Sequence, residues 1–163
     1  MRKSFFPSAL TAGLIAGTLD ITGACISAYI KSEGVTTPMK VLKYVASGAV
    51  DPTTFSSPVL LALFGLLVHF FIAISFAFFF FFLAKQIPSL VKYPIPIGIL
   101  YGIFVWATMR FVILVNLSRH KQKPIVTGAD FQNAAISAGI LVVCIGIPVA
   151  LLARKYVRSN VLT

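Results

Sequence analysis

The sequence predicts an all-α integral membrane protein in which four transmembrane helices form a bundle. Two observations lead to this fold class. Of the 163 residues, 58% are hydrophobic and 11% are charged, whereas about a quarter of the residues of a soluble domain are charged. Four apolar runs are each long enough to cross the hydrocarbon core as a helix, which takes about 20 residues. Because open sheets leave backbone groups unsatisfied in lipid, every span is expected to be helical.

We expect one transmembrane domain, residues 1–163, with four spans. Their ranges are 8–30, 58–83, 94–115 and 128–153. A cleaved signal peptide is the rival interpretation of the first range, and the position of Asp20 inside the apolar region argues against it. Ser57 before Pro58 is typical of a helix start, and Thr127 with Asp130 forms a capping-box pattern. Pro148 lies inside the last range and should bend that helix.

The longest connection is expected to contain a short helix over residues 38–50. Thr37 is a suitable N-cap for a helix that begins at Pro38. One face would be apolar and the other would carry lysines: Met39, Leu42, Ala46 and Ala49 against Lys40 and Lys43. Two arrangements fit this pattern. The helix lies on the membrane surface, or it packs over the end of the bundle.

The net charge of +10 has a distribution typical of membrane topology, because almost all lysines and arginines fall in tails and short connections. No basic patch outside the spans is interleaved with stacking aromatics, so we expect no nucleic-acid partner. Seven basic residues lie on the side that holds both termini and six on the other. On this small difference we expect both termini in the cytoplasm.

Three ionisable residues lie inside the spans: Asp20, His69 and Arg110. A charged side chain at the centre of a membrane helix costs about 2.5 to 3.5 kcal/mol on insertion scales, so such residues usually face protein. Around each of them, mostly small residues recur at every fourth position, and this spacing favours close contact between helices. We therefore expect a buried polar cluster in which Asp20 accepts hydrogen bonds from Arg110, His69 or both. The supporting groups would be Thr18, Thr22 and Asn116.

Two roles for this cluster compete. Polar contacts commonly hold transmembrane helices in register, and the cluster would then be structural. Alternatively, Asp20 and His69 exchange protons or line the path of an ion or solute. Arg110 could also extend to the membrane interface, which would leave the cluster incomplete.

The sequence gives little support to catalysis. It has four acidic residues, without a carboxylate pair in the spans, a Gly-x-Ser-x-Gly elbow or a phosphate-binding glycine loop. His120 is far from His69 in sequence, which disfavours two-histidine haem ligation. We expect no enzymatic activity, no cofactor and no metal site. Cys25 and Cys144 fall within spans and are interpreted as small packing residues.

Three segments carry a resemblance to known proteins: residues 13–20 (GLIAGTLD), 67–73 (LVHFFIA) and 98–102 (GILYG), followed by Met109. They resemble the YagU-like family, a group of small and mostly uncharacterised bacterial inner-membrane proteins. The resemblance covers the first three spans. It implies a location in the bacterial inner (cytoplasmic) membrane, and it implies no mechanism.

The function we expect is that of a small inner-membrane protein with a structural or accessory role. It would act through helix–helix contacts within the lipid bilayer, with a second copy of itself or with another membrane protein. The alternative is a proton-linked channel or transporter component that uses Asp20, His69 and Arg110.

Overall fold

The computed structural model describes residues 4–119 and 127–161, and the side chains of 115–117 and 161 are outside this description. The predicted fold class is confirmed. Within the described residues there is no strand, and four helices are long and apolar enough to cross a membrane. They span Phe5–Lys31, Pro58–Gln86, Pro94–Leu114 and Gly128–Asn160. The chain is therefore a multi-pass membrane protein.

Six α-helices and four irregular helical segments make up the described chain. The α-helices are α1 (Phe5–Lys31), α2 (Pro38–Ala49), α3 (Pro58–Gln86), α4 (Pro94–Ala107), α5 (Gly128–Leu141) and α6 (Ile147–Val161). Two short 3₁₀ turns are η1 (Pro52–Thr54) and η2 (Pro88–Val91), and two π-helical segments are η3 (Thr108–Leu117) and η4 (Val142–Gly146). The third span runs from α4 into η3, and the fourth runs from α5 through η4 into α6.

The helix starts follow the local chemistry of the sequence. The Thr37 side chain accepts a hydrogen bond from the backbone N–H of Lys40 at the start of α2. Ser57 caps α3 in the same manner. Thr127 and Asp130 form the predicted capping box at α5, in which each side chain accepts from the backbone N–H of the other residue.

Pro148 follows directly after a π-helical segment. Proline cannot donate the backbone hydrogen bond to the carbonyl four residues earlier, and the fourth span is π-helical over Val142–Gly146 just before it. The structure thus has a π-helical segment shortly before the proline, and the bend expected at Pro148 stays a prediction. The second π-helical segment, η3, has no proline within it, and its position was not predicted.

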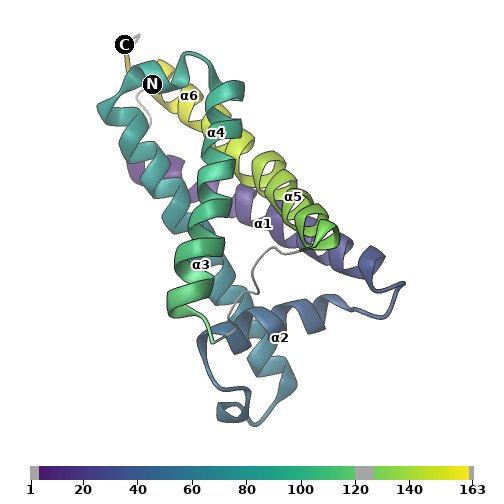
Figure 1. The fold of residues 1–163 in the computed structure, drawn as a ribbon. Coiled ribbons are helices and arrows are strands. Elements are labelled where there is room, and N and C mark those ends of the chain that lie inside the picture. Colours follow the sequence, from purple (N-terminus) through teal and green to yellow (C-terminus); the bar gives the residue numbers. More distant parts are fainter. Residues whose placement is uncertain (1–3, 120–126, 162–163) are drawn as a thin grey trace.

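The helices are arranged so that both termini lie at one end of the bundle and α2 lies at the other (Figure 1). α1 packs against α3 through small residues: a Cβ placed on Gly13 would lie 2.7 Å from the Cα of Ile74. α4 approaches η4 equally closely, because Gly98 and Gly102 face the backbone around Gly146. Glycine lets helix backbones come this near each other in a membrane.

α2 packs against the first half of α3. A side chain at Gly65 would collide with the carbonyl oxygen of Leu42, and Ala46 is fully buried. Met39, which we placed on the same apolar face, is 44% exposed. The contact with α3 is the feature that distinguishes a helix packed over the bundle end from one lying apart on the membrane surface.

The densest apolar packing occupies the half of the bundle near the termini. There α1, α3, α4 and α6 bury alanines and aromatic side chains, including Phe80, Phe81 and Tyr101. The Tyr101 hydroxyl donates a 2.6 Å hydrogen bond to the carbonyl oxygen of Phe76, which ties α4 to α3. The opposite half of the bundle contains the cavity described next.

Candidate functional site

A cavity of about 450 Å³ lies between the spans in the half of the bundle near α2. All four spans and α2 contribute to its wall. On α1 the lining residues run from Asp20 to Lys31, which is about 16 Å along a helix axis. Because Lys31 is exposed, the cavity reaches the protein surface at that end. Its volume is within the range of small-molecule binding pockets.

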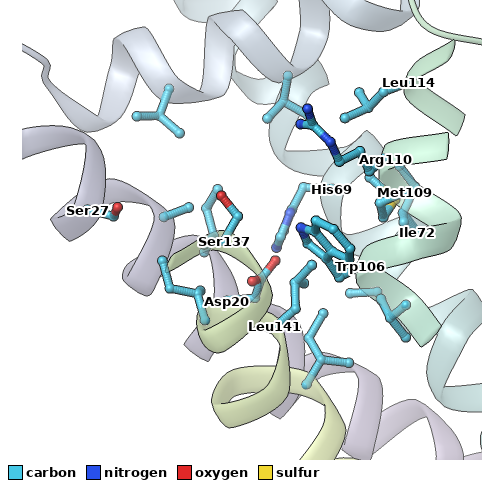
Figure 2. A pocket seen from close by; sticks show the side chains of 18 of the residues that line it. Asp20, Ser27, His69, Ile72, Trp106, Met109, Arg110, Leu114, Ser137 and Leu141 are labelled. Atoms are coloured by element: carbon cyan, nitrogen blue, oxygen red, sulfur yellow. The ribbon is translucent and has the colours of Figure 1, made fainter. Parts of the chain in front are cut away.

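The structure brings the three predicted ionisable residues to this one cavity. Asp20 comes from α1, His69 from α3 and Arg110 from η3, and each lines the wall (Figure 2). All three side chains are partly buried. Residues of three separate spans thus place a carboxylate, an imidazole and a guanidinium around a shared space inside the bundle.

His69 is anchored to the backbone of α1. Its Nε2 lies 2.8 Å from the carbonyl oxygen of Gly17, and because a carbonyl oxygen only accepts, Nε2 donates this hydrogen bond. The neutral ring then has an acceptor at Nδ1. Gly17 lies one helical turn before Asp20, so this bond holds the imidazole near the carboxylate, as Figure 2 shows.

The predicted pairing within the cluster differs from the observed one. Among the described residues, Asp20 forms no ion pair with Arg110 or His69, and the hydrogen bond of the His69 Nε2 goes to Gly17 instead. In Figure 2 the Arg110 guanidinium and the Asp20 carboxylate occupy different parts of the cavity. The cavity therefore separates Asp20 from Arg110, whereas His69 lies near the carboxylate without an ion pair to it.

Two of the predicted supporting residues do not belong to the site. The hydroxyls of Thr18 and Thr22 donate to the carbonyl oxygens of Leu14 and Thr18, at 2.8 and 2.7 Å. Both side chains are exposed, because a residue two positions from Asp20 lies about 200° around the helix from it. The side chain of Asn116 lies outside the described part of the chain.

Three polar residues of the wall were not assigned to the site from the sequence: Ser27, Lys31 and Ser137. Ser27 lines the cavity from α1 and Ser137 lines it from α5. Ser27 lies seven residues after Asp20, and this two-turn spacing on one helix face could have identified it. Ser137 is in a span for which no ionisable residue was assigned to the site, so nothing in its local sequence indicated a polar role.

The single tryptophan of the chain, Trp106, also lines the cavity. It lies one turn before Arg110, and both are labelled in Figure 2. Arg110 is part of the π-helical segment η3, and the lining residue Ile145 is part of η4. The five-residue segment η4 is of the single-turn kind that occurs frequently at functional sites, and the ten-residue segment η3 contributes to the same wall.

Outside the membrane, the end of the third span is fixed to the connection after α2. Arg119 forms a 2.8 Å ion pair with Asp51, and its backbone N–H donates to the carbonyl oxygen of Gly48. Hydrogen bonds from the Thr53 side chain and backbone lower the pKa of Asp51, and Arg119 lowers it further. The connection after α2 and the end of the third span are thereby held together.

Comparisons with known proteins give no match: no family model, no curated protein and no solved structure is similar to this chain. Within the described ranges, no group of three His, Cys, Asp or Glu side chains could hold a metal ion. The cavity and its polar groups are therefore the features of this chain that bear on function.

Proposed function

We propose that this protein is a proton-linked channel or transporter component that binds a small solute in the cavity. The observation that supports the proposal most directly is the meeting of Asp20, His69 and Arg110 at one cavity between the spans. Ionisable side chains in transmembrane segments commonly mark ion pathways and proton relays. A purely hydrophobic bundle would bury none of these groups.

The interactions of the cluster favour this role over a structural one. For Asp20 to act as a structural lock, its carboxylate would need a basic partner, because an unpaired charge in a low-dielectric interior is costly. In the described residues Asp20 has no ion pair with either basic neighbour. The carboxylate instead lines an open space, where water, a proton or a solute can reach it.

Asp20 and His69 would hold the proton in turn. Asp20 takes up a proton and becomes neutral, and it releases the proton when the site opens to the other side. His69 presents an imidazole, which can both accept and donate a proton. With Nε2 bound to Gly17, Nδ1 is the atom that would accept a proton. Four spans enclose little space, so we place the complete path in an assembly of several copies or with another membrane protein.

The test is proton flux into proteoliposomes. We expect flux with the native protein and its loss on Asp20→Asn, because an amide keeps the shape of the carboxyl group and cannot release a proton. Asp51→Asn is the matched control, since Asp51 is an exposed carboxylate outside the spans. Undiminished flux in the Asp20 variant would contradict the proposal. No flux in the native protein would do the same, and would favour the structural or accessory role.

We further propose that the protein resides in the bacterial inner membrane with both termini in the cytoplasm. Three observations support this location: the shared end of the two termini (Figure 1), the excess of one basic residue on that side and the YagU-like resemblance. Labelling of introduced cysteines from one side of sealed vesicles tests the orientation, as argued below.

A further inference from the structure

The wall of the cavity carries more positive than negative charges. Lys31 and Arg110 are two permanent cations, while Asp20 is the single carboxylate of the wall, so with His69 neutral the formal sum is +2 − 1 = +1. When Asp20 carries a proton, the sum rises to +2. The cavity together with its entrance therefore attracts an anion, most strongly when Asp20 is protonated.

The cations are also placed where a solute enters. Lys31 is the last residue of α1 and is exposed, and Arg110 is toward the same end of its span. Asp20 lies eleven residues deeper along α1. An anion that approaches from the α2 end would meet the ammonium and guanidinium groups before it reaches the carboxylate.

The remaining wall is chiefly apolar. Val41 and Val45 come from α2, Ile72 and Phe76 from α3, and Met109 and Leu114 from the third span. Such a wall suits a hydrocarbon chain or ring and offers little to a fully hydrated inorganic ion, whose dehydration would be uncompensated. A volume of about 450 Å³ accommodates a molecule of several carbon atoms.

From these three features we infer that the solute is a small amphipathic carboxylate, a single negative group attached to a short apolar chain or ring. Arg110 binds the carboxylate through the guanidinium fork, which matches carboxylate geometry, and Lys31 attracts it at the entrance. Asp20 would be the proton site that accompanies it. This inference rests on the proposed function and specifies the substrate class of the same site.

Trp106 provides the measurement, because the only tryptophan of the chain lies in the cavity wall. The protein is reconstituted in neutral phosphatidylcholine vesicles, so that anionic lipid does not compete. The probe is 6-bromohexanoate, whose bromine quenches indole fluorescence on contact. We expect saturable quenching by this carboxylate, and much weaker quenching by the uncharged 6-bromohexanamide and the cationic 6-bromohexylamine.

Two variants of the wall separate binding from simple partition into lipid. Arg110→Gln should weaken the apparent affinity at least roughly tenfold, since a hydrogen bond to a charged group is lost. Lys31→Gln should weaken it less and, because Lys31 is an exposed helix-end residue, keeps the fold intact. Arg158→Gln, which alters an exposed arginine of α6 outside the cavity, should leave the affinity unchanged.

Quenching that is equal for the three probes, or unchanged in both wall variants, would overturn the inference. Proton flux measured on the same vesicles distinguishes this failure from that of the proposed function. Asp20-dependent flux without carboxylate binding would overturn the substrate class alone. Saturable binding that needs Arg110, without any Asp20-dependent flux, would support the substrate class and overturn the transport role.

Discussion

At the scale of single residues, Asp51 shows how hydrogen bonds lower the pKa of a surface carboxylate without burial. Thr53 donates to its Oδ1 from both the side chain, at 2.7 Å, and the backbone N–H, at 3.0 Å. These bonds favour the ionised form, and the Arg119 guanidinium on Oδ2 adds to them, so the pKa of Asp51 lies below its ordinary value of 3.8. The carboxylate is thus held charged in the folded state.

This lowered pKa gives a prediction with a definite sign. Because the pKa of Asp51 is lower in the folded than in the unfolded state, its ionisation stabilises the fold at pH values above the ordinary pKa near 3.8. That contribution is lost as the pH falls through the lower, folded-state value. Thr53→Val removes the largest cause and should raise the pKa of Asp51, which the carboxyl carbon resonance of Asp51 would report. Thr54→Val, on the neighbouring exposed threonine, is the control, and an unshifted pKa in the Thr53 variant would contradict the assignment.

The identity of the cavity residues could be predicted from the sequence only in part. Hydrophobic run length and the cost of charges in lipid were enough to select Asp20, His69 and Arg110, and all three line one cavity. Their pairing could not be predicted, because a side chain on a contact face can bond to a neighbouring backbone as well as to another side chain. His69 does so with Gly17. The apolar lining and Ser137 depend on helix rotation, which no local pattern in the sequence specifies.

At the scale of helical elements, the bundle depends on glycine contacts between backbones. A Cβ on Gly102 would collide with the Cα of Val142 and lie 2.9 Å from its Cγ2. A backbone neighbour cannot rotate away as a side chain can, so α4 and η4 would have to separate. These segments carry part of the cavity wall, and their close contact fixes the position of Trp106 and Ile145 relative to each other.

Gly102→Val should therefore destabilise the protein by about 1 to 3 kcal/mol, the usual cost of overpacking. Resistance to unfolding by denaturing detergent, measured in mixed micelles, would report this loss. Gly139→Ala is the matched control, because nothing lies within 4 Å of the position where its Cβ would be. Alanine is favoured over glycine inside a helix, so this second variant should be equally or more stable. Equal resistance of the Gly102 variant and the native protein would show that the contact is not required.

The π-helical segments mark the limit of prediction at this scale. Helix starts at Pro58 and Thr127 followed from caps and prolines, which act through a few neighbouring atoms. Pro148 predicted a bend in the fourth span, which stays a prediction, and the π-helical segment η4 ends two residues before it. For η3, which contains Arg110, the sequence has no comparable local cause. Its geometry depends on packing between spans, and so the final direction of Arg110 was not predictable.

At the scale of the whole molecule, the fold divides into a densely packed half near the termini and a half with a cavity near α2. Alanines and large aromatic rings fill the first, and partly buried polar groups surround the space in the second. The packed half holds the spans together, so the other half can keep an open site. A solute would then enter from the α2 end. The orientation of the protein therefore decides from which side of the membrane the solute enters.

If both termini are cytoplasmic, α2 and the entrance of the cavity face the opposite side. We expect Ser4→Cys, four residues from the start of the chain, to react with a membrane-impermeant maleimide only after intact cells are opened. Thr37→Cys, at the exposed start of α2, should react from outside. Cys25 and Cys144 lie within spans, and their replacement by alanine removes background labelling. The reverse pattern would contradict the proposed orientation and place the entrance of the cavity on the cytoplasmic side, where its cations would attract carboxylates from within the cell.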